Sequence, residues 1–324
     1  MNSRTKVLVT GASGFIGRAI IEELKSAPDY CIVSASRSHE RIFPEIEHWT
    51  HDLLNSRILP NLSEVDTVVH TAARVHITND KTNDKLAAFR ATNVTGTKIL
   101  ASAAAAAGVR RFIYLSSIKV NGETTYPGLP FTVSDRPAPQ DPYGISKYEA
   151  ELSLREIERK TGLEVVIVRP PLVYGPGVKA NFQTMMGLVQ RGIPLPFGAI
   201  DNQRSLVALN NLVDLLTCCI KHEAAAGRTF LVSDGEDQST PQLIRSMAEA
   251  LGRSPRLMPI PKKLLSILAS CCRKKSITQR LCDSLQVDIA YTRRVLDWAP
   301  RITFKKALAE TANAYILERK LKEQ

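Results

Sequence analysis

The order of apolar and polar residues along the first half of the chain predicts alternating strands and helices. Short apolar runs typical of buried strands are centred near Val7, Ile32, Val68, Phe112 and Val166. Two longer segments, 86–107 and 143–160, have the spacing of helices. This alternation predicts parallel βαβ units. After residue 169 prolines and glycines accumulate and the alternation is lost, so a second, different region is expected there.

Three glycines follow the first predicted strand, Lys6–Val9, at positions 11, 14 and 17. Glycines at this spacing allow a sharp turn from strand to helix, close approach of a pyrophosphate to the backbone, and tight packing of the helix on the sheet. The amphipathic segment that follows supports a helix whose first amides face the anion. We therefore expect a dinucleotide to contact Gly11, Ser13, Gly14, Phe15, Ile16 and Gly17.

A second pattern, at the start of the helix predicted over 143–160, concerns proton transfer. Asp141 is a suitable N-cap and Pro142 suits the first helical position. Tyr143 and Lys147 are four residues apart and share one helix face. A neighbouring ammonium favours the phenolate, so we expect Lys147 to lower the pKa of Tyr143 from its usual value near 10. This pair is a candidate general acid and base.

The buried strand predicted around Phe112 ends in two hydroxyl residues, Ser116 and Ser117. Ligands bind at the carboxyl edge of parallel sheets, which is where this strand ends. A serine there is placed to hydrogen-bond the same substrate oxygen that Tyr143 protonates.

Together these motifs resemble the extended short-chain dehydrogenases/reductases, the NAD-dependent epimerase/dehydratase family, over nearly the whole length. The motifs that carry the resemblance are GASGFIG at 11–17, HTAA at 70–73, LSS at 115–117, YGISK at 143–147 and RPPLVYGPG at 169–177. The resemblance implies a catalytic triad of Ser117, Tyr143 and Lys147. Lys147 would also bind the nicotinamide ribose, and Tyr143 contacts the cofactor as well.

The resemblance also implies an α/β fold, a Rossmann-type doubly wound parallel sheet with a smaller, interleaved C-terminal α+β substrate domain. The dinucleotide-binding domain is expected over 1–170, with a returning strand near 228–234, and the substrate-binding domain over 171–324. Family members of this kind are dimers, so a homodimer built on the two long helices is expected.

The end of the second predicted strand bears on the choice of cofactor. An acidic residue about 20 positions beyond the glycines grips the ribose of NAD, but here Ser36 and Arg37 stand in that region. A guanidinium binds a 2′-phosphate by charge-assisted hydrogen bonds, so we favour NADP, with NAD still open. Further cofactor contacts implied by the resemblance are Asp52, Leu53, Ala72, Ala73 and Pro170.

Two reaction types remain open. Dehydratases of the family carry Asp-Glu after the catalytic hydroxyl, whereas this chain has Ile118 and Lys119, which argues against dehydration. We favour a 4-ketoreductase that reduces UDP-2-acetamido-2,6-dideoxy-4-keto-hexose to UDP-N-acetylquinovosamine. The alternative is a 4-epimerase of a UDP-hexose or UDP-N-acetylhexosamine.

The substrate half suggests a small-molecule nucleotide sugar. Asn181 resembles a residue beside the nucleotide, Arg204 matches a family arginine for the diphosphate, and Arg280 is a weaker phosphate candidate. Two other classes stay open: a family member without catalysis that senses the cofactor, and a reductase of steroid or flavonoid type with an apolar pocket.

Composition adds limits. The 324 residues carry a net charge of +11 but no nucleic-acid-binding motif, and the six cysteines lack metal-ligand spacing, so neither nucleic acid nor metal is expected. A cytoplasmic location is expected because no signal peptide or 20-residue apolar span is evident. Segment 262–275 is basic around an apolar run. We favour a lid or core helix there over peripheral contact with anionic lipid.

Overall fold

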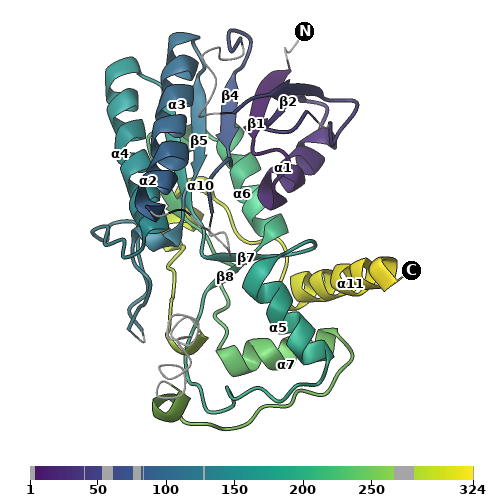
Figure 1. Ribbon diagram of the computed structural model, residues 1–324. Helices are drawn as coiled ribbons and strands as arrows, with labels where there is room; N and C mark the ends of the chain where they lie inside the picture. Colours follow the sequence, from purple (N-terminus) through teal and green to yellow (C-terminus); the bar gives the residue numbers. More distant parts are fainter. Residues whose placement is uncertain are drawn as a thin grey trace.

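The computed structural model describes residues 4–39, 41–52, 61–75, 82, 84–126, 128–265 and 281–323 (Figure 1). Its centre is a seven-stranded, wholly parallel sheet in the order β3-β2-β1-β4-β5-β6-β9. The strands are β1 (Thr5–Thr10), β2 (Tyr30–Ser36), β3 (Glu47–Thr50), β4 (Thr67–His70), β5 (Arg111–Leu115), β6 (Glu164–Arg169) and β9 (Thr229–Leu231). The strands expected from the hydrophobic pattern are confirmed, and β9 is the expected returning strand.

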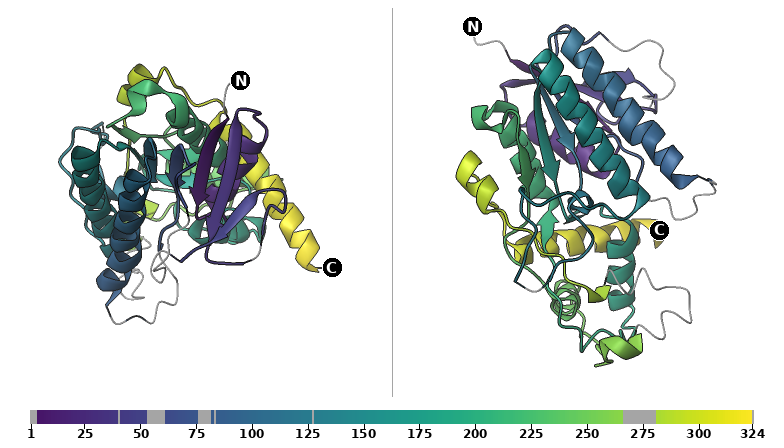
Figure 2. Two further views of the ribbon diagram at one scale, coloured as in Figure 1. Left: turned by 90° about the horizontal axis from the view of Figure 1, so that it is seen from above. Right: turned by 90° about the vertical axis from the view of Figure 1, so that its left-hand side faces the viewer.

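Both faces of this sheet are covered by helices, because successive side chains of a strand point to opposite faces. Val7 and Val9 of β1 pack on one side, against α1 (Phe15–Lys25), whereas Leu8 packs on the other. The first face also holds α6 (Leu209–Lys221), which contacts α1. The opposite face is covered by α2 (Lys85–Arg90), α3 (Thr97–Ala106) and α4 (Pro142–Thr161), as Figure 2 shows.

Both long helices predicted from the sequence are present, with one difference. A single π-helical segment, Ala91–Gly96, joins α2 to α3, so the predicted helix over 86–107 is continuous but locally widened. Single π turns of this kind are frequent at functional sites. Asn93 in this segment is 1 % exposed.

The region after β6 leaves the large sheet and returns to it more than once. A two-stranded parallel sheet pairs β7 (Leu172–Tyr174) with β8 (Leu206–Ala208). The remaining α-helices of the described residues are α5 (Ala180–Gln190), α7 (Thr240–Ala250), α10 (Ala290–Leu296) and α11 (Phe304–Glu323). α7 packs against α5 and α11, whereas α10 contacts β9 of the large sheet. The segments therefore interleave, and the division at residue 170 stays a prediction.

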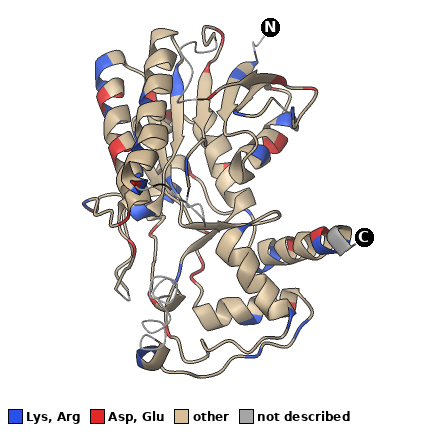
Figure 3. Cartoon of the chain, viewed as in Figure 1, with Lys and Arg blue, Asp and Glu red and all other residues tan. Residues whose placement is uncertain are grey.

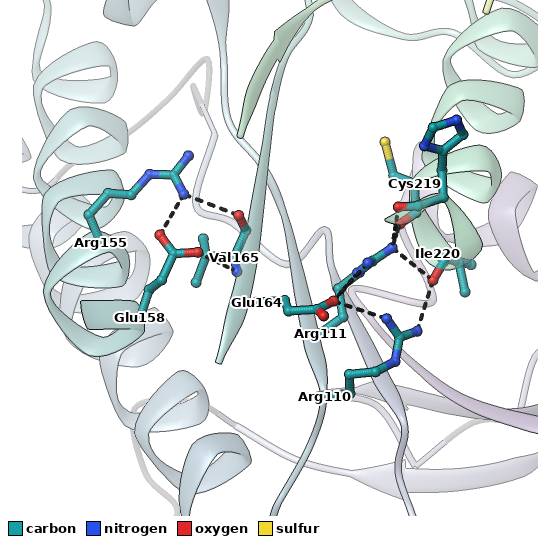
Figure 4. A network of polar contacts seen from close by, with 9 residues as sticks. Arg110, Arg111, Arg155, Glu158, Glu164, Val165, Cys219 and Ile220 are labelled. Atoms are coloured by element: carbon teal, nitrogen blue, oxygen red, sulfur yellow. Dashed lines mark hydrogen bonds and ion pairs between the residues drawn. The ribbon is translucent and has the colours of Figure 1, made fainter. Parts of the chain in front are cut away.

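A buried arginine ties α6 to the sheet (Figure 4). Arg111 at the start of β5 is 1 % exposed and donates to the carbonyl oxygens of Cys219, Ile220 and His222, at 2.7, 3.1 and 2.9 Å. These carbonyls lie at the C-terminus of α6, where helix acceptors have no intrahelical donor. The positive charge of Arg111 is balanced by the carboxylate of Glu164, 2.7 Å away. Arg111 thus caps α6 and fixes it against β5, the strand that Ser117 follows.

A second buried network joins the two regions of the chain. Asp234, just after β9, accepts hydrogen bonds from the Tyr174 hydroxyl and from the Asn211 amide, both at 2.8 Å. The Asn211 amide also donates to the Ile302 carbonyl at 2.9 Å. Asn211 is fully buried. This network connects β7, α6, β9 and the segment before α11.

The helix surfaces carry mixed charge. Basic and acidic residues are interspersed along α4 and α11 (Figure 3). Within the described ranges, none of the helices combines the length and apolar character that a bilayer span requires.

Candidate active site

The turn between β1 and α1 has a shape that requires glycine at two positions. Gly11 has φ of 71°, and a Cβ there would lie 2.7 Å from the backbone nitrogen of Ala72. A Cβ on Gly17 would lie 2.2 Å from the carbonyl oxygen of Gly11. Ser13 and Gly14 are exposed at the tip of the turn, and α1 starts directly after them. Since the first amides of a helix lack intrahelical acceptors, the turn fits the diphosphate of a dinucleotide.

The other predicted cofactor residues lie along the same carboxyl edge of the sheet. They are Phe15 and Ile16 in the first turn of α1, Asp52 after β3, Ala72 and Ala73 after β4, and Pro170, which follows β6. Leu53 lies outside the described residues.

At the end of β2, Ser36 is buried and Arg37 is exposed. The Ser36 hydroxyl donates to the Ser38 carbonyl at 3.2 Å. His48 of β3 lies beside them: its Nδ1 is 2.9 Å from the Ser34 hydroxyl and its Nε2 is 3.0 Å from the Ser38 carbonyl. Sequence analysis missed His48, because only the pairing of β2 with β3 brings it to this edge. The end of β2 therefore carries the guanidinium of Arg37 beside serine hydroxyls and the imidazole of His48. None of these side chains is a carboxylate.

The two hydroxyls at the end of β5 have different roles. The Ser116 hydroxyl points into the protein and donates to Oε1 of Glu151 at 2.5 Å. The Ser117 hydroxyl accepts from the backbone N–H of Lys119 at 3.3 Å and lines the cavity described below. Of the two, only Ser117 faces the site.

The start of α4 is as the sequence predicts. The Asp141 side chain accepts from the backbone N–H of Gly144 at 2.7 Å, and Pro142 occupies the first helical turn. Tyr143 lines the same cavity as Ser117. Lys147 is buried, and its ammonium donates to the carbonyl of Leu115 at 2.8 Å. One helix turn and one strand end thus bring the three predicted catalytic residues to one place.

The electrostatics of this group correct one expectation. Burial and the nearby carboxylate of Asp141 raise the pKa of Tyr143 above its usual value, instead of Lys147 lowering it. Burial also lowers the pKa of Lys147 to about 7, although Glu151 opposes this shift. The ammonium lies 4.5 Å from the ring centre of Tyr114 and 5.9 Å from that of Tyr143. The phenol of Tyr143 is thus protonated at neutral pH in the absence of bound ligands.

Behind Lys147, a buried ion pair fixes α4 against the sheet. Glu151, one turn after Lys147, accepts from Nε and Nη2 of Arg169 at 2.9 and 2.5 Å. Nη1 of Arg169 donates to Oδ1 of Asn121 at 2.9 Å. Sequence analysis missed Glu151, yet its spacing of four residues from Lys147 was a usable signal. The pair joins α4, β6 and the segment after Ser117.

Asn93 links the loop after β4 to the same helix. Its amide nitrogen donates to the Ser146 hydroxyl at 2.9 Å and to the Arg74 carbonyl at 3.1 Å, and its oxygen accepts from the Arg74 N–H at 2.8 Å. The loop that follows Ala72 is therefore held at a fixed distance from Tyr143 and Lys147.

A cavity of about 540 Å³ opens in front of these residues. Ser117 and Tyr143 line it together with two of the predicted substrate residues, Asn181 and Arg204. Asn181 is exposed at the start of α5, and Nη1 of Arg204 donates to the Asp283 carbonyl at 2.8 Å. The third, Arg280, lies outside the described residues, as does most of segment 262–275.

Much of the remaining lining is apolar and was not anticipated. It includes Leu172, Met185, Leu188, Leu195, Phe197 and Leu285. These residues come from the interleaved segments after β6, so no single sequence motif marks them. The cavity therefore brings polar groups that are capable of proton transfer together with a cationic group that is suited to binding phosphate.

The sequence matches the model of the NAD dependent epimerase/dehydratase family over residues 7–233. The chain is also 44% identical over 313 residues to the UDP-glucose 4-epimerase of Vibrio cholerae. The aligned region covers 96% of this chain and 95% of that protein. The chain belongs to this family. The resemblance seen in the motifs is confirmed.

Solved structures agree with this family fold. The UDP-glucuronic acid 4-epimerase of Bacillus cereus, in complex with UDP-glucuronic acid and NAD, superposes with a TM-score of 0.78 at 19% identity, over 97% of this chain and 100% of that chain. The UDP-glucose 4-epimerase of Thermotoga maritima, with UDP-glucose, gives 0.77 at 21% identity, over 98% and 100%. At these identities the likeness shows the family's fold: a doubly wound sheet with a smaller part beside it.

Proposed function

We propose that this family member acts at C4 of a UDP-sugar as a 4-epimerase. The observation that carries the proposal is that Ser117 and Tyr143 line one cavity with Arg204. The 44% identical relative, named a UDP-glucose 4-epimerase, supports the epimerase over the ketoreductase that the sequence alone favours.

Each residue has a defined task in this proposal. Tyr143 exchanges a proton with the C4 oxygen, and the Ser117 hydroxyl holds that oxygen. The buried ammonium of Lys147 stabilises the phenolate when Tyr143 loses its proton. Arg204 binds the diphosphate and Asn181 lies beside the nucleotide. The glycine turn would hold the dinucleotide, which would supply reversible hydride transfer at C4.

The ketoreductase remains the second candidate, and the end of β2 favours it. Ser36 and Arg37 occupy the region where a carboxylate would grip the ribose of NAD, and Arg37 is exposed. A guanidinium there suits NADP, and an exchangeable phosphorylated cofactor suits net reduction. Tyr143, protonated at neutral pH, is in the form that donates to a carbonyl oxygen. The NADP preference and the UDP-N-acetylquinovosamine product belong to this second candidate.

One experiment separates the two candidates. The purified protein is incubated with UDP-glucose or UDP-N-acetylglucosamine without added cofactor, and separately with a UDP-4-keto-6-deoxy-N-acetylhexosamine plus NADPH or NADH. Interconversion of C4 epimers, seen by NMR, supports the epimerase. Stoichiometric loss of absorbance from the reduced cofactor, with one C4 alcohol formed, supports the reductase. If no interconversion and no reduction is seen, the proposal that the protein acts at C4 of UDP-sugars is wrong.

The same assays address the non-catalytic alternative. A cofactor-sensing protein would bind NAD or NADP but convert none of these sugars. The homodimer, the cytoplasmic location and the boundary at residue 170 stay predictions. Sedimentation of the purified protein measures the first of them directly.

A further inference from the structure

The turn that follows Ser117 is packed directly on the start of α4. A Cβ on Gly144 would lie 2.9 Å from the carbonyl oxygen of Lys119 and 3.3 Å from its Cβ. The backbone N–H of Lys119 meanwhile donates to the Ser117 hydroxyl oxygen. Lys119 therefore contacts both of the elements that carry the catalytic hydroxyls.

The side chain of Lys119 makes a second connection between them. Its ammonium pairs with the carboxylate of Asp141 and with that of Glu123, the latter at 3.1 Å. The three side chains are only 16 to 26% exposed. Asp141 uses its other oxygen, Oδ1, to cap α4 through Gly144. One carboxylate thus holds the start of the helix and the lysine at once.

We propose that Lys119 is a positioning residue: its clamp on Asp141 and Glu123 fixes Tyr143 relative to Ser117. This inference rests on the proposed function, because it assigns a role in the same reaction. Lys119 also lines the cavity beside both hydroxyls. It acts through Asp141 and the turn, since its ammonium is bound to carboxylates. Misplacement of a catalytic group by about 1 Å can cost about a hundredfold in rate.

The clamp also has an electrostatic effect on Tyr143. Among the described residues, the charged and titratable groups near Tyr143 include Asp141 and Lys147 on its own helix and Tyr114 from β5. Lys119 and Glu123 come from the turn and line the same cavity as Tyr143. Asp141 raises the pKa of Tyr143, and the ammonium of Lys119 offsets part of this negative charge. Removing that ammonium leaves the negative charge of Asp141 less balanced, so we expect the pH dependence of turnover to move to higher pH.

The test compares Lys119→Met with Lys119→Arg and with a control on the same helix, Lys160→Met. Lys160 forms an exposed pair with Glu156 near the far end of α4. We expect Lys119→Met to lower kcat at least tenfold with little change in KM for the UDP-sugar. The Tyr143 limb of the kcat profile should move to higher pH. Lys119→Arg should restore most of kcat, and Lys160→Met should match the wild type.

The double variant Lys119→Met/Asp141→Asn separates charge from position. Asparagine still caps a helix, so the pH midpoint should return toward the wild-type value while kcat stays low. If Lys119→Met folds poorly, Glu123→Gln loosens the same clamp with a smaller change. It should lower kcat without the move to higher pH, because this substitution removes a negative charge. A wild-type kcat and pH profile in Lys119→Met, or equal losses in Lys119→Met and Lys119→Arg, would overturn the inference.

A readout without turnover distinguishes failure of this inference from failure of the proposed function. Amide hydrogen exchange in the first turn of α4, residues 143–147, should be faster in Lys119→Met than in the wild type. If the wild type converts no UDP-sugar yet exchange is faster, the proposed function fails and the clamp stands. If neither amide exchange nor kcat changes in Lys119→Met, the inference about the clamp is wrong and the proposed function is unaffected.

Discussion

Lys147 and Tyr143 lie one turn apart on α4. Burial lowers the pKa of Lys147 and raises that of Tyr143, so it favours the neutral form of each side chain. A buried lysine is a cost to folding because the charged form loses its hydration. The hydrogen bond to the Leu115 carbonyl recovers only part of this cost. At the scale of single residues, burying Lys147 therefore lowers the stability of the fold at the place where the proposed function requires proton transfer.

A first prediction follows for the phenol itself. Tyr143→Phe removes the proton donor but keeps the ring that packs edge-on against Phe89 at 5.9 Å between centres. We expect turnover to fall by at least about a hundredfold, while the affinity for the dinucleotide, measured by calorimetry, stays within about twofold. Turnover equal to that of the wild type would contradict the catalytic role.

A second prediction concerns the stability cost of Lys147. Its pKa is lowered to about 7 in the folded protein, below the unfolded value. The cost is therefore full below pH 7 and disappears as the pH rises toward the unfolded pKa, about 10.4. We expect Lys147→Met, measured without cofactor, to be more stable than the wild type at pH 6, by an amount on the order of a few kcal/mol.

Urea unfolding at pH 6 and pH 9 checks this prediction. The stability difference between Lys147→Met and the wild type should be smaller at pH 9. A difference that does not change with pH would show that the lysine is not held in an unfavourable charged state. The same variant should be inactive, which separates stability from function at this position.

At the scale of elements, a buried arginine fixes α6, a helix that carries none of the proposed catalytic groups. Arg111 satisfies three carbonyls at the C-terminus of α6, whereas the adjacent Arg110 is 45% exposed, shares the Glu164 carboxylate and donates to only one of those carbonyls, that of Ile220, at 3.1 Å. Truncating one partner of a buried, hydrogen-bonded pair costs about 3–5 kcal/mol, and an exposed pair contributes about 1 kcal/mol or less. The two neighbours therefore form a matched comparison.

We expect Arg111→Met to lower the free energy of unfolding by about 3 kcal/mol or more, and Arg110→Met by less than about 1 kcal/mol. Chemical denaturation of both variants measures the difference. Equal effects of the two substitutions would mean that the cap on α6 contributes little beyond surface charge.

At the scale of the whole molecule, the site is formed where two regions meet. The glycine turn belongs to the large sheet, and Arg204 belongs to the interleaved segments after β6. The backbone of Arg204 is bridged to Gln238 and Leu285, so its side chain can be removed without losing those contacts. Binding of the UDP-sugar and binding of the dinucleotide should therefore be separable by mutation.

A fourth prediction tests this separation by thermal shift. A ligand present at a hundredfold its Kd stabilises the folded state by about 2.7 kcal/mol. Arg204→Ala should lose most of the stabilisation by UDP and keep that by NAD or NADP. Gly17→Ala, where a Cβ would meet the Gly11 carbonyl at 2.2 Å, should lose the cofactor effect. If Arg204→Ala keeps the full UDP effect, its assignment to the diphosphate is wrong.

The sequence by itself determined the parallel sheet, the glycine turn, the cap at Asp141 and the pairing of Tyr143 with Lys147. These features depend on local periodicity and on short spacings, which a sequence displays directly. They also sufficed to place Ser117 at the same edge of the sheet, because parallel strands end together.

Tertiary structure alone decided the rest. The pKa of Tyr143 is set by burial and by Asp141, and burial depends on everything packed around the residue. His48, the Glu151–Arg169 pair and the apolar cavity lining come from segments distant in sequence, or from contacts across elements. The Lys119 clamp is formed by a turn that meets a helix 22 residues later. Such contacts leave no periodic trace, because the chain brings these groups together only when the sheet and its helices close on one another.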